Sequence, residues 1–482
     1  MTALAAAAVW LQPVLLAALA LRIAAGAPDA AWLPLGALVA PLVAMLAANR
    51  RVADLGPIAR AALAVSVTVL LAADLVVAAD LATSLDATPW LGVVAAGALA
   101  LVVPLIPGAR QASPVLLAIV ATVLLLPLVS IGATTRTAPW TAWSRGALRG
   151  TLTFPETSAW VGKGERFARA DRLLFTEGQR VTAVSGGVFR VVERDVTPPT
   201  VREWRLAPGE ALTLRPGDEL ALEAGTRLRF EPGRRVPGAP ASGIVWADAP
   251  GRSAAMLPSA LGALVTLIGG ALALVPAVRR GSAAITGPAV LLIATLAAVG
   301  WGVFAGSIAP DLPLGGSLVA PMLRLPIRAL GARTGAPLTV LTAVALTVLL
   351  LTAAVALRGR LVAACGPAPV LWAAAVGAGG LITALRPEPW RLLTLALGVA
   401  AAGCAPALLA SGRIAGQAGC AIGVLVFAIL AALPLLAPAL ASWLEPLVRY
   451  PSLVAMPLGL MAARMLARIS PEEDEEAPPV VR

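Results

Sequence analysis

Histidine is absent from this 482-residue chain. Its absence removes the commonest general base, the usual haem ligand and most zinc sites, and it excludes Ser-His-Asp and Cys-His catalysis. Cysteine is almost as scarce, since the chain has only Cys365, Cys404 and Cys420, all inside apolar runs. The polar part of the chain therefore has no disulfide. Small apolar core residues are the simplest interpretation of these thiols, and a buried soft-metal or redox site is the alternative.

Charge is also rare. Only 13% of the residues are charged, whereas 59% are hydrophobic, and of the 37 basic residues Lys163 is the one lysine. The apolar share exceeds that of a globular protein by roughly ten percentage points, so the lipid bilayer must serve as the solvent. A formal charge of +11 would indicate nucleic acid in a soluble protein. Here the arginine bias and the abundant alanine are typical of GC-rich coding, and we expect no nucleic-acid partner.

Long apolar runs are present on both sides of one polar block. A spanning helix needs about 20 mostly apolar residues, and runs such as 336–357 and 418–441 reach that length without a charge. The run at 9–25 lacks a basic n-region and a clean cleavage site, so we expect a first helix rather than a cleaved signal. Further spans are expected at 32–48, 61–80, 91–107, 114–133, 256–278, 284–306, 336–357, 361–385, 392–410, 418–441 and 451–468. The sequence thus predicts a polytopic α-helical membrane protein with about 12 transmembrane helices.

Arginines in the short loops predict the orientation of these spans. Every second loop is basic, and the intervening loops carry acidic residues and tryptophan or tyrosine, as interfacial anchors do. The basic loops contain Arg50, Arg51 and Arg60, then Arg110, then Arg279 and Arg280, then Arg358 and Arg360, and Arg413. We therefore expect a multi-pass protein of the bacterial inner membrane with both termini in the cytoplasm and the polar block outside.

Residues 307–335 depart from this pattern. They carry Arg324, Arg328 and Arg333 on the expected outer side, spaced along one helical face against leucines and isoleucine. An amphipathic helix in the interface, or a re-entrant segment, would accommodate both these arginines and the prolines Pro321 and Pro326. A true span here would instead change the helix count and the orientation of the C-terminus.

The polar block divides the chain into four expected parts: an N-terminal membrane domain at 1–135, an extracytoplasmic β-domain with its stalk at 136–255, a C-terminal membrane domain at 256–468 and an acidic tail at 469–482. The stalk is rich in Trp and Arg, namely Trp140, Trp143, Arg145 and Arg149. Interface anchoring is the simplest interpretation of this mixture, and contact with anionic lipid head groups or a polyanionic envelope polymer is the alternative. The tail reads PEEDEE, which is typical of a solvated disordered end, with a cytoplasmic docking motif as the alternative.

Alternating leucines in the polar block predict short β-strands. The clearest hairpin joins 211–214 to 219–223 through Pro216-Gly217-Asp218, and a further strand follows at 226–230. Seven or eight such strands suffice for a small sandwich or barrel. Its candidate core residues are Phe167, Phe175, Phe189, Trp204, Phe230 and Trp246. For Trp204, a platform that stacks on carbohydrate is the alternative to a core position.

The Pro-Gly-Asp and Ala-Gly-Thr turns resemble those of cupin and jelly-roll domains over roughly 30 residues. This resemblance implies a turn-rich β-fold and nothing more, because the metal-binding histidines of such domains are absent. We carry no site across, and we expect no metal and no cofactor.

Asp74 is the clearest candidate for a functional residue inside the membrane. It lies well inside its expected span, whose outer end is at Asp80, six residues further along the chain. A charge at mid-bilayer costs about 3 kcal/mol or more, so a buried carboxyl survives for a reason. Either Asp74 is hydrogen-bonded to a neighbouring helix, or it couples protons or contacts a substrate.

Three functions follow as hypotheses. The first is a noncatalytic scaffold of bacterial envelope assembly, in which the helices anchor and the β-domain binds a membrane or envelope protein, or an envelope polymer. The second is a transporter or a flippase for lipid-linked precursors, as proline-interrupted helices suggest. The third is a membrane glycosyltransferase or polymerase that uses outer-loop carboxylates and phosphate-binding arginines. Its candidates are Asp29, Asp311, Glu388, Arg324, Arg328, Arg386 and Arg391.

Overall fold

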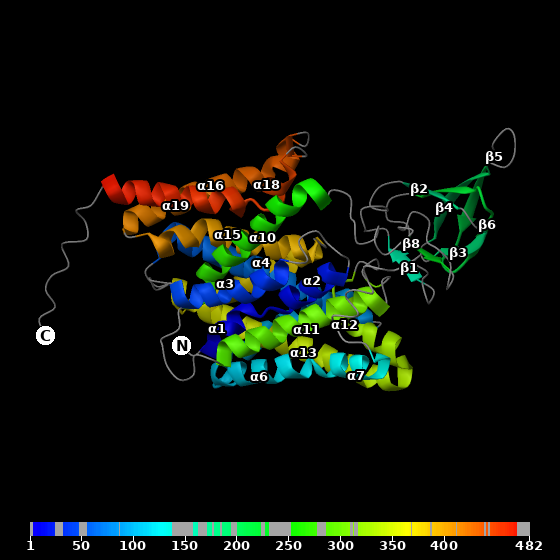
Figure 1. Ribbon diagram of the computed structural model, residues 1–482, viewed down its shortest axis with the longest axis horizontal. Helices are drawn as coiled ribbons and strands as arrows, with labels where there is room; N and C mark the ends of the chain where they lie inside the picture. The colour runs from blue at the N-terminus through cyan, green and yellow to red at the C-terminus, as the bar shows by residue number, and fades with distance from the viewer. Residues whose placement is uncertain are drawn as a thin grey trace, which may run out of the picture.

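In this computed structural model, the described residues form a body of helices and a separate pair of β-sheets (Figure 1). The described residues are 3–24, 32–47, 55–85, 87–136, 158–161, 171–175, 178–183, 186–193, 200–222, 227–230, 252–276, 286–308, 312, 317–367, 369–385, 388–410, 412–437, 440–441 and 444–469. The stalk residues Trp140, Trp143, Arg145 and Arg149 and the acidic tail lie outside them, as do Asp29, Asp311 and Arg386.

Seven helical segments of the described part are long and apolar enough to cross a bilayer, which agrees with a helical membrane protein. They are α4 (Pro57–Ser84), α6 with α7 (Ala109–Val123 and Leu126–Thr135), α11 (Thr286–Ile308), α12 with α13 (Ala320–Leu323 and Leu325–Cys365), α15 (Pro389–Leu409), α16 (Arg413–Leu436) and α19 (Ser452–Ile469). A bent pair, α1 (Ala3–Trp10) and α2 (Pro13–Ala24), makes up to eight.

Four shorter apolar helices coincide with further predicted spans. They are α3 (Leu33–Ala47), α5 (Pro89–Val102), α10 (Arg252–Leu274) and α14 (Pro369–Ala384). The apolar parts of these helices are 10–17 residues long, below the length of a full span. The total of about 12 crossings therefore stays a prediction.

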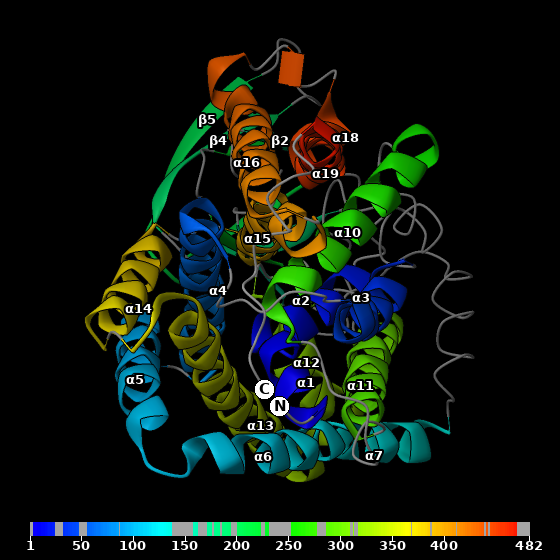
Figure 2. The same ribbon diagram turned by 90° about the vertical axis from the view of Figure 1, so that its left-hand side faces the viewer.

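The helices lie side by side, with their long axes roughly parallel (Figures 1 and 2). α1 begins and α19 ends at one end of the body, whereas α7 ends and α10 begins at the opposite end (Figure 1). In the middle, α15 packs against both α4 and α10, and α16 packs along α19. The apolar side chains and alanines of these helices form one continuous core.

Close helix packing depends on glycine at several crossings. A Cβ added to Gly419 would lie 2.5 Å from the carbonyl oxygen of Gly459, and one added to Gly423 would lie 2.3 Å from that of Ala402. A Cβ on Gly302 would likewise lie 2.7 Å from the carbonyl oxygen of Ala20. Glycine at these positions therefore lets the neighbouring helices approach closely.

Residues 317–331 fold back as a short helical hairpin. Gly331 has φ 76° and ψ 167°, a backbone conformation that favours glycine, and it separates the first turns of α13 from its long part. Thr339 Oγ1 donates to the carbonyl oxygen of Leu323 at 2.8 Å, which ties the hairpin to the long part of α13. Pro321 and Pro326 are buried, whereas Arg324 and Arg333 are exposed and Arg328 is half-buried. This agrees with a segment that packs its prolines on the helices and turns Arg324 and Arg333 outward.

The prediction of a loop at 358–360, between the spans at 336–357 and 361–385, is wrong. α13 continues to Cys365, so Arg358 and Arg360 lie in its last turns and not in a loop. Gly359 does not interrupt α13, and the helix ends at Gly366, whose φ of 83° favours glycine.

The β-strands form two four-stranded antiparallel sheets around a shared core, which makes the domain a sandwich. One sheet has the order β1-β8-β3-β6 and the other β2-β7-β4-β5. The strands are β1 (Ser158–Val161), β2 (Asp171–Leu174), β3 (Gln179–Ala183), β4 (Gly187–Glu193), β5 (Thr200–Leu206), β6 (Ala211–Leu214), β7 (Glu219–Leu222) and β8 (Arg227–Phe230). The predicted hairpin is the β6 to β7 connection, although its strands pair in different sheets. A turn between two sheets replaces the expected hairpin turn.

Phe175 and Phe189 are core residues as predicted, 1% and 3% exposed. The prediction that Trp204 is a core residue is wrong, because its side chain is 43% exposed. Trp204 lies opposite Phe189 on β5, so its side chain does share the inner face of the sheet. β5 is the edge strand of its sheet. The alternation of residues along a strand predicts which face a side chain is on, but not whether other residues pack over it. Phe167, Trp246 and the side chain of Phe230 lie outside the described residues.

Candidate functional site

The break between α1 and α2 is the centre of the candidate site. The two helices meet at an angle of 59°, with Leu11 and Gln12 between them. Proline is common at the first position of a helix, and it disfavours a helical backbone conformation in the residue before it. Pro13 therefore begins α2, and the break falls at Gln12. A helix broken among apolar helices exposes backbone groups that water cannot satisfy, so each needs a partner within the protein.

Asp74 supplies the partner at the start of α2. Its Oδ1 accepts a hydrogen bond from the backbone N–H of Val14 at 3.2 Å, and its side chain is 2% exposed. Pro13 has no N–H, and the N–H groups of Leu15 and Leu16 donate to the carbonyl oxygen of Gln12 at 3.1 and 3.3 Å. The first four residues of α2 therefore leave no free N–H. Asp74 acts as an N-cap delivered from another helix.

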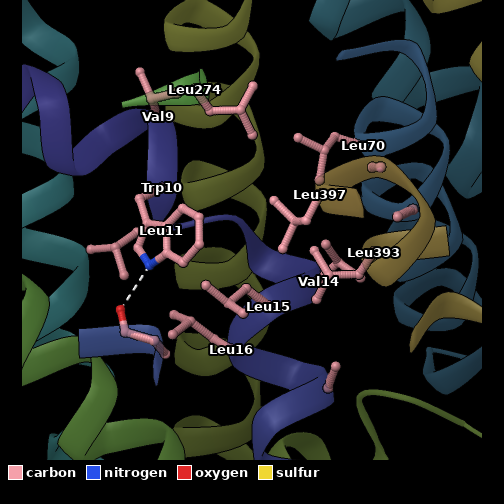
Figure 3. Packing of buried hydrophobic residues seen from close by; sticks show 14 of the residues in the cluster. Val9, Trp10, Leu11, Val14, Leu15, Leu16, Leu70, Leu274, Leu393 and Leu397 are labelled. Carbon is pink, nitrogen blue, oxygen red and sulfur yellow. Dashed lines mark hydrogen bonds between the residues drawn. The ribbon is translucent and has the colours of Figure 1, made fainter. Parts of the chain in front are cut away.

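Three carbonyl groups at the end of α1 accept hydrogen bonds from the residues that follow the helix. The carbonyl of Ala7 accepts from the N–H of Leu11 at 2.9 Å, and that of Trp10 accepts from the N–H of Gln12 at 2.8 Å. The side chain of Gln12 turns back, and its Nε2 donates to the carbonyl of Val9 at 2.7 Å. The Nε1 of Trp10 donates to the carbonyl oxygen of Ala37 at 2.8 Å, the bond drawn dashed in Figure 3, and so fixes α1 to α3.

A small cavity adjoins the break. Its volume is about 10 Å³, close to the space of one water molecule. Leucines from α2, α4, α10 and α15 line it together with Val9, Trp10 and Gln12, and Figure 3 shows these apolar side chains converging. The Oε1 of Gln12 has no hydrogen-bond partner in the described structure. Asp74 is not among the lining residues, so this cavity is not a polar path to the carboxyl.

Other buried or half-buried charges also meet the ends of neighbouring helices. On α4, Asp80 Oδ2 accepts from the N–H of Leu318 at 2.7 Å, just before α12, and from Ser317 Oγ at 3.4 Å. On α13, Arg358 Nη1 donates to the carbonyl of Pro104 at 2.6 Å, in the 3₁₀ turn η2 (Val103–Leu105) that ends α5. Arg360 Nη2 donates to the carbonyl of Ala273 at 2.6 Å, at the end of α10.

The signs of these charges match the ends that they meet. The aspartates accept from N–H groups at or just before the start of a helix, and the guanidinium groups donate to carbonyl groups at the end of a helix. The helix dipole favours this arrangement of acidic and basic groups. Arg360 is 7% exposed, so its contact is a structural bond in the core rather than a surface interaction. Each contact joins elements distant in the sequence, and together they lock α2, α5, α10 and α12 to α4 and α13.

The outer-loop candidates are only partly placed by the structure. Arg324, Glu388 and Arg391 are exposed, and their side chains have no hydrogen bond or ion pair with one another in the described part. Glu388 is the residue before α15, but its side chain does not cap that helix. Beside it, the guanidinium carbon of Arg22 lies 4.7 Å from the ring centroid of Trp390, a cation–π contact at the end of α2.

The cysteines are free thiols in the described structure. Cys404 and Cys420 are buried, and Cys404 Sγ donates to the carbonyl of Ala59 at 3.2 Å. Among the described residues, no three His, Cys, Asp or Glu side chains gather in a way that could hold a metal ion.

The sequence makes Asp74 a candidate but does not identify its partner, since 60 residues separate Asp74 from Val14. The Gln12-Pro13 pair inside an apolar run was the available signal. The role of Arg358 and Arg360 as caps had no local signal, because the carbonyls that they meet lie 254 and 87 residues away.

Comparison of the chain with protein-family models, with curated proteins and with solved structures found no match.

Proposed function

We propose that the protein is a noncatalytic scaffold of the bacterial inner membrane, in which a rigid helical body anchors the β-sandwich on the outer side for envelope assembly. The observation that carries this proposal is the set of cross-helix hydrogen bonds from Asp74, Asp80, Arg358 and Arg360 to backbone groups at or beside helix ends. A transporter must move helices past one another around a polar site. Here these buried or half-buried side chains bind backbone groups at or beside helix ends, which opposes such movement.

The arrangement of the chain supports the same proposal. The helix ends that lead into and out of the sandwich lie at one end of the body, and the first and last described helices start and finish at the other (Figure 1). An outer sandwich with both termini in the cytoplasm has this geometry. The partner of the sandwich would be a membrane or envelope protein, or an envelope polymer.

A second candidate, a transporter or lipid-linked precursor flippase, is favoured by one observation. Transporters use broken helices whose N-termini face a carboxylate or an anionic substrate near the bilayer midplane, and α2 begins in that way at Asp74. This is the weaker proposal, because each N–H in the first four residues of α2 already has an acceptor within the protein and leaves none for a substrate. For a glycosyltransferase, the only candidate carboxylate in the described residues is the exposed Glu388, which alone makes no acid-base pair, and we do not propose it.

The test is complementation of a deletion strain in an assay of envelope integrity. Asn at position 74 keeps an acceptor for Val14 but cannot release a proton. A scaffold predicts that Asp74→Asn restores the wild-type phenotype, whereas a chain whose sandwich is replaced by a flexible linker does not. Failure of Asp74→Asn at normal abundance would favour transport, and full complementation without the sandwich would contradict the scaffold.

A further inference from the structure

Strand β5 is a long, open edge of the sandwich. It closes the sheet β2-β7-β4-β5 and pairs only with β4 in the described structure. Residues 200–205 are all exposed, and Leu206 is half-buried. An open edge of seven residues presents unpaired N–H and C=O groups, on which another strand can add. No proline or lysine interrupts it.

Most of the charge on this edge is already paired within the sandwich. Arg190 Nε lies 2.7 Å from Glu203 Oε1, and Arg202 Nη1 lies 3.3 Å from Glu193 Oε1, both pairs running across from β4 to β5. Arg205 has no hydrogen bond or ion pair in the described structure, although it lies on the same outer face as Glu203. The edge therefore combines an exposed tryptophan with one unpaired cation.

We propose that two copies of this chain associate through β5, edge to edge and antiparallel, with Trp204 on the two-fold axis. Three symmetric registers pair at least five of the seven residues, centred on Arg202, Glu203 or Trp204. The first places Arg202 opposite Arg202, and the second places Glu203 opposite Glu203. Like charges directly opposite each other destabilise a strand pair.

The register centred on Trp204 places opposite charges, rather than like charges, across from each other. It places Glu203 of each copy opposite Arg205 of the other, so two ion pairs form on the outer face. On the inner face the two tryptophans meet, and Arg202 lies opposite Leu206. Opposite charges and aromatic pairs stabilise cross-strand neighbours. This charge complementarity selects a second copy, because the same five residues, 202–206, supply both sides of the interface.

The dimer explains two features of the monomer. Arg205 gains a carboxylate, and Trp204 gains a partner on the inner face, where β5 ends the sheet. Two four-stranded sheets then form one continuous sheet across the axis. The inference stands apart from the proposed function, since it concerns association and can be tested without any activity.

The test is cysteine cross-linking of the full-length chain in native membranes. Directly opposite residues have Cβ atoms about 4.5–5.5 Å apart, close to the range that a disulfide bridges. We expect Trp204→Cys to form a covalent dimer on mild oxidation. The matched control is Val188→Cys on the neighbouring strand, which is 38% exposed but away from the axis. Cross-linking no greater than this control would overturn the proposal, as would products with a different protein only.

Charge reversal tests the register. In the Trp204→Cys background, Arg205→Glu should reduce the dimer by about tenfold or more, because it faces Glu203 of the second copy. Glu203→Arg should do the same, and the double variant should return to within about twofold of the parent, because the two charges are exchanged. Arg205→Glu is the cleaner single change, since Arg205 has no partner within its own chain. Single variants that dimerise normally, or a folded double variant that stays monomeric, would refute this register.

Discussion

Replacing Asp74 by leucine removes the only acceptor of the Val14 N–H at the start of α2. The N–H is buried by the same packing that leaves Asp74 2% exposed, so water cannot replace the carboxyl. An unsatisfied buried N–H costs about 1–3 kcal/mol, and the loss of an N-cap costs a similar amount, roughly 0.5–2 kcal/mol. Since both describe one bond, we expect the free energy of unfolding to fall by about 1–3 kcal/mol.

Asparagine at the same position should behave differently. Its Oδ1 can accept from Val14 as the carboxyl oxygen does, so Asp74→Asn should lie within about 1 kcal/mol of the wild type. The measurement is unfolding of the purified protein in detergent, by heat or denaturant. The control is Ser66→Ala on the same helix, because Ser66 is fully buried and its hydroxyl has no partner in the described structure. This control should be neutral or stabilising.

Two outcomes would refute this reasoning. If Asp74→Leu were as stable as the wild type or more so, the cost of burying the carboxyl would exceed the value of the cap. If Asp74→Asn were destabilised as much as Asp74→Leu, the negative charge and not the acceptor would hold α2 in place.

Three further predictions concern other contacts. Arg360→Met should lower stability by about 1–3 kcal/mol in the same unfolding assay, because it leaves the Ala273 carbonyl without a donor, and an unchanged midpoint would show that the cap contributes nothing. Gly331→Ala should cost about 1–3 kcal/mol because of the positive φ, whereas Gly380→Ala, with open space around its Cβ on α14, should be neutral or stabilising by up to about 1 kcal/mol; equal effects would contradict this assignment of strain. Phe189→Ala should destabilise the sandwich by about 3–5 kcal/mol, whereas the exposed Trp204→Ala should cost far less, and protease digestion of the full-length chain should rank them in that order.

Apolar runs and turn residues predicted most of the fold. The long helices coincide with predicted spans because a run such as 336–357 has no soluble alternative, and Phe175 and Phe189 were found through alternation. The helix end at Cys365 was missed because charged residues continue a helix when their side chains find carbonyls, as Arg358 and Arg360 do. The burial of Trp204 was predicted wrongly because it depends on the order of the strands in the sheet. The alternation of residues along one strand gives no information about that order.

The candidate site was half predictable. A buried carboxylate in an apolar run is visible in the sequence, and so is a proline that ends a helix. The pairing of Asp74 with Val14 is not visible, because it depends on how α2 and α4 pack. The outer-loop carboxylates remain predictions, since Asp311 lies outside the described residues and Glu388 makes no side-chain cap.

The Gln12-Pro13 break also has a consequence for the order of biogenesis. Val14 is synthesised 60 residues before Asp74, so the first helix leaves the ribosome while its acceptor does not yet exist. In lipid, a segment with an unsatisfied N–H cannot settle into its final bend. We therefore expect α4 to complete the bend on its arrival, so that α2 reaches its native position only after a later helix has entered the membrane.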